Sequence, residues 1–211
     1  MSELRIGLVG TGGIGRTHIE RINTKLQGAK VVACADPAAA FGLSVAEKFG
    51  IKGYEDPIAM INDPEIDAII NTTADAYHEQ FVTAAIKAGK YVFCEKPLAP
   101  KADACKRIIA AEMEAGKPLV QVGFMRRYDA GYKQVKEILD SGAFGAPLIL
   151  KCTHRNPEVG TNYDTPMAVH DTAIHEIDVL HWLIHDEYVS AQVMMPRTTK
   201  YSHPALKDPR L

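Results

Sequence analysis

An aspartate and a histidine lie four residues apart in the segment 171–178, which reads Asp-Thr-Ala-Ile-His-Glu-Ile-Asp. In a helix this spacing puts the side chains of Asp171 and His175 on one face. A carboxylate beside an imidazole fixes the tautomer of the ring and raises its proton affinity, which suits a base that takes the proton of an alcohol near neutral pH. The structural alternatives are an N-terminal helix cap for Asp171 and a hydrogen-bonded core histidine for His175.

A lysine follows a short apolar run, at Lys96 after Tyr91–Cys94, and it precedes Pro97. Proline restricts the residue before it to extended backbone, which limits the directions that the lysine side chain explores. If the run is a strand of a parallel sheet, the ammonium lies at the carboxyl edge of that sheet, where α/β proteins bind ligands. Lys96 is therefore a candidate site residue, and the alternative is a solvated charge at the end of a strand.

Residues 10–15 read Gly-Thr-Gly-Gly-Ile-Gly between an apolar run and an amphipathic segment, which is the context of a dinucleotide-binding loop. Gly10 permits a tight turn, and Gly15 lets helix and strand pack closely. Gly12 leaves the backbone N–H groups of a helix N-terminus open to a pyrophosphate. The glycine pattern alone is a weak signal, so it needs the support of a residue that could bind the ribose.

An acidic residue, Asp36, ends the second apolar run about twenty residues past the last of these glycines. Its carboxylate can accept both hydroxyls of an adenosine ribose, and its charge would repel a 2′-phosphate. The two residues after it, Pro37 and Ala38, offer no cation to such a phosphate, so the sequence favours NAD over NADP. Asp36 could instead, or in addition, cap a helix that begins at Pro37.

Short apolar runs alternate with longer amphipathic segments through the first 123 residues. The runs predict buried strands at Leu4–Val9, Lys30–Asp36, Asp67–Thr72, Lys90–Cys94 and Pro118–Val122. The intervening segments predict helices at Gly15–Lys25, Ala38–Phe49, Ala76–Ala88 and Ala102–Ala115. Strands that alternate with helices are parallel and joined by right-handed crossovers, so residues 1–123 are predicted to form a doubly wound α/β domain of the Rossmann type.

The pattern changes after residue 123. We expect residues 124–211 to begin an α+β domain with a mixed or antiparallel sheet, truncated because the polar tail supplies no further strand. The predicted elements are helices at Gly131–Asp140 and Asp171–Ile184 and strands at Pro147–Thr153 and Tyr188–Met194.

The composition excludes several classes of function. With 46% apolar residues, a formal charge of -2 and a pI near 6.4, the chain has no basic field for nucleic acid and no apolar run long enough for a membrane span. The four cysteines lack metal or disulfide spacing, so we expect reduced thiols in a cytoplasmic protein. His181 and His185 have helical spacing without a third ligand, so we expect packing or surface histidines and no metal site.

Four ordered motifs carry a family resemblance: Gly-Thr-Gly-Gly-Ile-Gly at 10–15, Cys-Glu-Lys-Pro at 94–97, Gly-Phe-Met-Arg-Arg-Tyr-Asp at 123–129 and the segment 171–178. Together they resemble the Gfo/Idh/MocA oxidoreductases, and within them the inositol dehydrogenases. The resemblance implies NAD-dependent oxidation of myo-inositol to 2-keto-myo-inositol in a homo-oligomer, a tetramer in the family. It also implies that His175 is the base, that Asp171 supports it, and that Lys96 donates a hydrogen bond to the reacting oxygen.

The resemblance implies further contacts with cofactor and substrate. The expected cofactor contacts are Gly10, Gly12, Gly13, Ile14, Gly15, Asp36, Thr72, Thr73, His78 and Glu95. The expected substrate contacts are Arg126, His154, Asn156 and Asp178, and Arg127 is an alternative to Arg126 because adjacent residues cannot be distinguished by sequence.

Two departures from the family pattern leave alternatives open. The stretch from Thr72 to His78 reads Thr-Thr-Ala-Asp-Ala-Tyr-His, where much of the family has a Thr-Pro-Asn turn before the histidine. The chain also stops at Leu211, whereas family members continue through most of the second-domain sheet. The second hypothesis is therefore an NAD-binding module without catalysis, and the third is a related sugar oxidoreductase.

Overall fold

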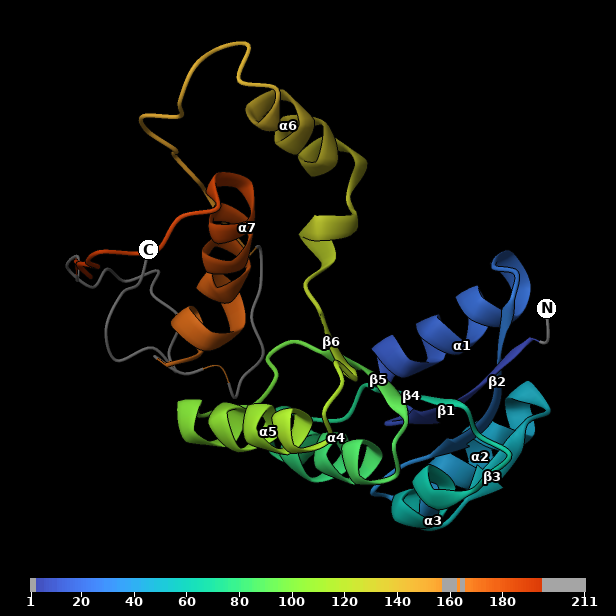
Figure 1. Ribbon diagram of the computed structural model, residues 1–211. Helices are drawn as coiled ribbons and strands as arrows, with labels where there is room; N and C mark the ends of the chain where they lie inside the picture. Colours follow the sequence, from blue (N-terminus) through green and yellow to red (C-terminus); the bar gives the residue numbers. More distant parts are fainter. Residues whose placement is uncertain (1–2, 157–162, 164–165, 195–211) are drawn as a thin grey trace, which may run out of the picture. The chain divides into compact units, whose positions relative to one another are not determined.

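A computed structural model of the chain describes residues 3–156, 163 and 166–194. The chain divides into two compact units, Met1–Gly123 and Phe124–Leu211. The first unit contains a sheet with helices on both faces, and the described part of the second contains helices and connecting segments (Figure 1). Among the described helices, none combines the length and the apolar character needed to cross a bilayer.

The first unit is built on one parallel sheet of six strands. The strands are β1 (Leu4–Val9), β2 (Ala29–Ala35), β3 (Lys52–Tyr54), β4 (Ala68–Asn71), β5 (Tyr91–Glu95) and β6 (Val120–Gly123). Their order is β3-β2-β1-β4-β5-β6, so the direction of strand addition reverses between β1 and β4. This order and the parallel pairing confirm the predicted Rossmann fold, and ligands bind such sheets at the reversal point, beyond the carboxyl ends of the strands.

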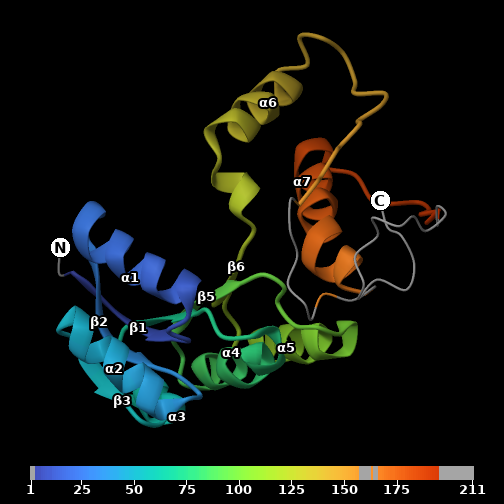
Figure 2. The ribbon, with the colours of Figure 1, turned by 180° about the vertical axis from the view of Figure 1, so that it is seen from behind.

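Helices cover both faces of this sheet. They are α1 (Gly13–Lys25), α2 (Ala39–Phe49), α3 (Pro57–Asn62), α4 (His78–Lys87) and α5 (Ala102–Glu114), with a 3-10 turn, η1 (Asp75–Tyr77), before α4. Ile19 of α1 and Val45 of α2 belong to one buried core, and Met60 of α3, Phe81 of α4 and Ile108 of α5 belong to the other. The helices α4 and α5 lie side by side in both views (Figures 1 and 2). The two cores fix the sheet from both sides and hold its carboxyl edge in place.

The sequence analysis did not predict two elements of the first unit, β3 and α3. The strand β3 has three residues at the edge of the sheet, which is too short to give an apolar alternation. The helix α3 has a clear start signal, because Pro57 is its first residue and the carboxylate of Asp56 accepts a hydrogen bond from the N–H of Ile58 at 2.8 Å. The Asp-Pro pair could have located this helix.

The described part of the second unit is helical. A 3-10 turn, η2 (Met125–Tyr128), leads into α6 (Ala130–Asp140), and a π-helical turn, η3 (Ala168–Ala173), leads into α7 (Ile174–Ile184). Asp129 caps α6, since its carboxylate accepts a hydrogen bond from the N–H of Tyr132 at 3.1 Å. The two helices predicted for this unit are confirmed, and the second has a wider first turn than an α-helix.

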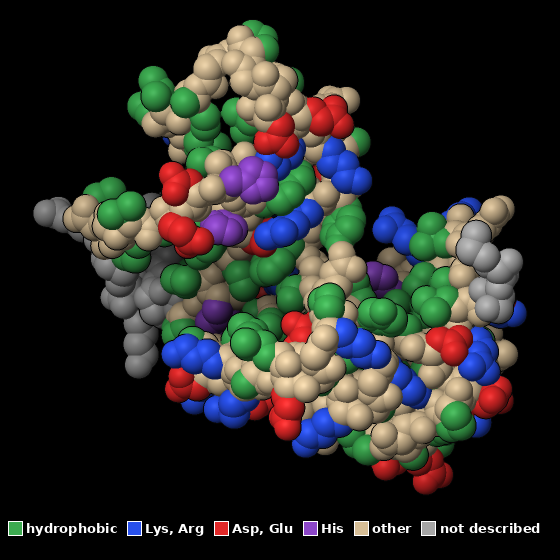
Figure 3. Space-filling view, viewed as in Figure 1, with side chains coloured by type: hydrophobic (Ala, Val, Ile, Leu, Met, Phe, Trp, Pro, Cys, Tyr) green, Lys and Arg blue, Asp and Glu red, His purple; other side chains and the backbone are tan. Residues whose placement is uncertain are grey.

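The two strands predicted for the second unit are wrong. Every residue of Pro147–Thr153 and Tyr188–Met194 is described, and neither segment pairs as a strand. A strand needs a hydrogen-bonded neighbour, and the described residues of this unit form no other strand. Apolar side chains in these segments are solvent-exposed, with Leu148 at 91% and Val189 at 99%, and hydrophobic surface lies over the segment after α6 in Figure 3. These segments have the apolar alternation of a strand but pair with no strand among the described residues.

Candidate active site

The glycine loop of the first unit is folded tightly on one side and open on the other. Gly10 has a φ of +94°, and a Cβ on Gly15 would lie 2.0 Å from the carbonyl oxygen of Gly10. These two positions therefore require glycine. A Cβ on Gly12 or Gly13 would meet nothing within 4 Å. These two residues form the N-terminus of α1, where unpaired N–H groups can bind a pyrophosphate and no side chain stands in its way.

Asp36 lies beside this loop at the end of β2. Its Oδ2 accepts hydrogen bonds from the backbone N–H of Thr11 at 2.7 Å and from its hydroxyl at 3.1 Å, and its Oδ1 accepts one from the N–H of Ala38 at 2.9 Å. The N-cap of α2 is Ala38, so Asp36 does not cap that helix. A carboxylate offers about four acceptor positions, so three donors leave room for a ligand hydroxyl. Thr11, fully buried, orients the carboxylate and was missed by the sequence prediction.

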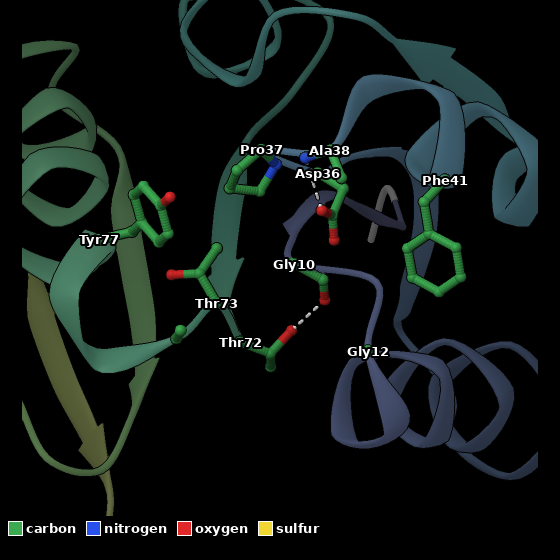
Figure 4. A pocket seen from close by; sticks show the side chains of 10 residues that line it. Gly10, Gly12, Asp36, Pro37, Ala38, Phe41, Thr72, Thr73 and Tyr77 are labelled. Carbon is green, nitrogen blue, oxygen red and sulfur yellow. Dashed lines mark hydrogen bonds between the residues drawn. The ribbon is translucent and has the colours of Figure 1, made fainter. Parts of the chain in front are cut away.

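A pocket of about 440 Å³ opens at the point where the strand order reverses (Figure 4). The residues that line it are Gly10, Gly12, Asp36, Pro37, Ala38, Phe41, Thr72, Thr73, Ala74 and Tyr77. The hydroxyl of Thr72 donates a hydrogen bond to the carbonyl of Gly10 at 2.5 Å, which ties the end of β4 to the glycine loop. Of the described residues that line the pocket, none is Lys or Arg. The open helix N-terminus and the carboxylate fit NAD better than NADP.

His78 is fully buried at the start of α4. Its Nδ1 lies 2.6 Å from the carbonyl of Pro97 and its Nε2 lies 3.0 Å from the carbonyl of Thr73. Both partners are backbone carbonyl oxygens, which accept hydrogen bonds. The ring thus links the loop after β4 to the loop after β5, next to Lys96. The expected contribution of His78 to cofactor binding is therefore indirect: its ring holds these two backbone segments in place.

The end of β5 carries two further predicted residues, Glu95 and Lys96. The Oε1 of Glu95 lies 3.0 Å from Nε2 of His18 on α1, and each side chain is 25% exposed. Lys96 comes next at the carboxyl end of the strand and is half-buried. Ile14, in the first turn of α1, is 58% exposed. The predicted cofactor residues of this unit therefore lie along one edge of its sheet.

The second unit brings four predicted residues into one polar cluster. Arg126 forms an ion pair with Glu176, and Oε2 of Glu176 lies 3.2 Å from Nδ1 of His154. Nε2 of His154 lies 3.1 Å from Oδ1 of Asn156. The rings of His154 and His175 have centroids 6.3 Å apart. Residues far apart in sequence thus converge beside the predicted base.

Glu176 is the member of this cluster that the sequence prediction missed. Burial alone would raise the pKa of Glu176, but hydrogen bonds with Arg126 and His154 outweigh it and hold that pKa below its ordinary value. The carboxylate is therefore an ionised anchor between the two side chains. Its position directly after His175, in the segment His-Glu-Ile-Asp, was the available signal.

The adjacent arginines have different partners. Arg127 donates two hydrogen bonds to Asp178, at 2.9 and 2.6 Å, and this pairing raises the pKa of Arg127. The side chain of Asp178 is 8% exposed, and that of Arg126 is 16% exposed against 39% for Arg127. Arg126 is thus the arginine that joins the cluster around His154, and Arg127 neutralises Asp178.

His175 and Asp171 lie on either side of a change in helix type. Asp171 belongs to the π-helical turn η3, and His175 lies in the first turn of α7 and is 8% exposed. π-helical turns recur at functional sites because they re-aim side chains. His181 and His185 are exposed, and His185 ends α7 with a φ of 57°. Histidines lie among charged side chains over α7 (Figure 3), yet no group of three or more metal-binding side chains occurs among the described residues.

Fold and pocket together define a dinucleotide-binding protein of the Rossmann class. Residues 4–124 match the family model described as "Oxidoreductase family, NAD-binding Rossmann fold", and residues 132–208 match the Gfo/Idh/MocA C-terminal domain. The chain therefore belongs to the Gfo/Idh/MocA oxidoreductase family, and its first unit is the NAD-binding domain of that family.

Several known proteins are similar to this chain. An inositol 2-dehydrogenase of Pseudomonas fluorescens strain Pf-5 is 51% identical over 210 residues, which cover 99% of this chain and 62% of that protein. An inositol 2-dehydrogenase/D-chiro-inositol 3-dehydrogenase of Halalkalibacterium halodurans is also 51% identical, with 60% of its length covered. The crystal structure of a Lactobacillus casei myo-inositol dehydrogenase with NAD(H) and myo-inositol superposes with a TM-score of 0.90 at 42% identity, covering 94% of this chain and 59% of that one. The chain thus spans about three fifths of the length of these relatives.

Proposed function

We propose that the protein oxidises myo-inositol to 2-keto-myo-inositol with NAD as the oxidant. The observation that carries this proposal is the convergence of Arg126, His154, Asn156 and Glu176 beside His175. A ring with many similar hydroxyls is recognised by several placed donors and acceptors, and this cluster offers them. The similarity to inositol 2-dehydrogenases over 99% of the chain supports the choice of substrate.

NAD, when bound, supplies the acceptor for the hydride that leaves the substrate carbon. The proposed tasks of the chain's own residues are binding, orientation and proton transfer. His175 takes the proton of the reacting hydroxyl, and Asp171 stabilises the imidazolium that forms. Lys96 donates a hydrogen bond to the same oxygen and stabilises its developing negative charge. The proposed cofactor contacts are the glycine loop, Asp36, Thr72 and Thr73, with Ile14, His78 and Glu95 along the same edge.

Two measurements test the proposal. The first follows NADH formation by absorbance, with myo-inositol and separately with an aldose, and the second is a titration of NADH binding. A rate with myo-inositol is the expected result. NADH binding without a rate on either compound would leave an NAD-binding module, and a rate with the aldose alone would make the protein a sugar oxidoreductase. The NADH titration separates a failed cofactor site from a failed substrate site.

We also propose that the protein assembles as a homo-oligomer in the cytoplasm, with residues 1–123 as the cofactor domain and residues 124–211 contributing substrate contacts. Light scattering coupled to size-exclusion chromatography measures the assembly directly. A monomer at micromolar concentration would contradict this part of the proposal.

A further inference from the structure

One aromatic side chain of the cofactor pocket lies outside every motif of the sequence. Phe41, in the first turn of α2, lines the pocket together with Asp36 and is 44% exposed (Figure 4). The exposed part of the ring is apolar surface that a ligand bound in the pocket can cover, and the free energy of burial grows with the apolar area covered. The other aromatic residue of the lining, Tyr77, is 43% exposed and its ring stacks on Phe81.

Backbone contacts place Phe41 beside Asp36. A Cβ on the next residue, Gly42, would lie 2.9 Å from the backbone nitrogen of Asp36. The first turn of α2 therefore packs directly against the end of β2. The N–H groups of Phe41 and Gly42 both donate to the carbonyl of Ala38, at 2.9 and 3.0 Å, which fixes this turn. The backbone of Phe41 is thus held at a fixed place next to Asp36.

The side chains in this part of the pocket match the adenosine half of a dinucleotide. The pocket has one carboxylate, two glycines and two threonines, and the rest of its lining is apolar or aromatic: Pro37, Ala38, Phe41, Ala74 and Tyr77. Adenosine combines neutral hydroxyls, which the carboxylate accepts, with a flat heteroaromatic base, which apolar side chains cover. We propose that Phe41 packs against the adenosine half of the cofactor and is a determinant of cofactor affinity. This inference rests on the proposed function only in taking NAD as the ligand.

The test compares Phe41→Ala with Phe41→Leu, which keeps most of the apolar cover. Tyr91→Ala is the matched control, because Tyr91 is a 60% exposed aromatic residue that begins β5, and so lies at the edge of the sheet opposite the pocket. Each variant is titrated with NADH, with ADP-ribose in competition, and with reduced nicotinamide mononucleotide, which lacks the adenosine. Circular dichroism verifies that each variant is folded.

Phe41→Ala is expected to weaken NADH and ADP-ribose about tenfold, in line with the loss of one aromatic contact to a base, and to leave the mononucleotide unchanged. Phe41→Leu and Tyr91→Ala should stay within about threefold of the unaltered chain. Unchanged affinity for ADP-ribose in folded Phe41→Ala would overturn the inference, and so would an equal loss for the mononucleotide. If the unaltered chain bound no NADH, the proposed function itself would fail, and the titration shows this before any variant is made.

Discussion

Replacing Asp36 by Ser together with Pro37 by Arg should shift the cofactor preference from NAD toward NADP. The carboxylate of Asp36 is held at the pocket by three donors from Thr11 and Ala38. Two unit charges about 4 Å apart repel by about 4 kcal/mol at the effective dielectric constant near a protein surface. Because Asp36 is half-exposed, we halve this value to about 2 kcal/mol. The carboxylate alone should therefore disfavour a 2′-phosphate roughly thirtyfold.

The assay is a fluorescence titration with NADH and with NADPH. The quantity compared is the Kd for NADPH divided by the Kd for NADH. Asp36→Asn keeps the size of the side chain and removes its charge, so it should reduce the ratio roughly thirtyfold by itself. Pro37→Arg alone keeps the carboxylate and should change the ratio less than the double replacement does. Asp36→Ser should also cost about 1–3 kcal/mol of stability, because the buried N–H of Thr11 loses its acceptor. An unchanged ratio in the double variant would mean that the ribose lies elsewhere.

Three further predictions concern the loop, the base and the thiols. Gly15→Ala should destabilise the protein by about 3 kcal/mol in thermal unfolding, since its Cβ would lie 2.0 Å from a backbone carbonyl. Gly12→Ala has open space around its Cβ and should cost under about 1 kcal/mol, yet weaken NADH binding about tenfold or more; the reverse order would refute the loop geometry. His175→Ala should abolish NADH formation with myo-inositol while NADH affinity stays within about twofold, and near-normal turnover would remove this residue from the mechanism. Burial raises the pKa of Cys94 to about 12, so at pH 8 only about one thiol in 10⁴ is ionised; iodoacetamide followed by mass spectrometry should label exposed Cys152 and leave Cys94 unmodified until the protein unfolds.

The fold of the first unit was predictable because its elements are decided by local pattern. The strands β1, β2 and β4 are apolar runs buried on both faces, β5 and β6 are partly buried, and the alternation with helices leaves only a parallel sheet. The strand β3 was not predictable from its three residues, since it forms by pairing with β2 at the sheet edge. Sequence pattern therefore located the strands that fill the core and missed the one that pairing alone creates.

The structure of the second unit was harder to predict, because its strands and ion pairs depend on contacts between segments that are far apart in the sequence. The segments Pro147–Thr153 and Tyr188–Met194 have an apolar alternation, but alternation becomes a strand only with a neighbour. Which arginine joins the cluster is decided by Glu176 and Asp178, two carboxylates on α7 that each select one guanidinium. The family resemblance therefore predicted which residues belong to the site. The structure was needed to show which of these side chains pair with each other.

The geometry around the proposed base also lay beyond the sequence. A four-residue spacing places Asp171 and His175 on one face of a regular α-helix, but the π-helical turn Ala168–Ala173 changes the rotation per residue before α7 begins. Nothing in the sequence of this turn marks it as π-helical. The spacing thus identified the two residues, while the path of the backbone between them had to come from the structure.

The most direct test of the account is a crystal structure of this chain with NAD and myo-inositol bound. We expect the pyrophosphate at the N–H groups of Gly12 and Gly13, the adenosine ribose hydrogen-bonded to Asp36, and one inositol hydroxyl within hydrogen-bonding distance of both His175 and Lys96. A dinucleotide bound away from the glycine loop, or an inositol ring that contacts neither His175 nor Lys96, would contradict it.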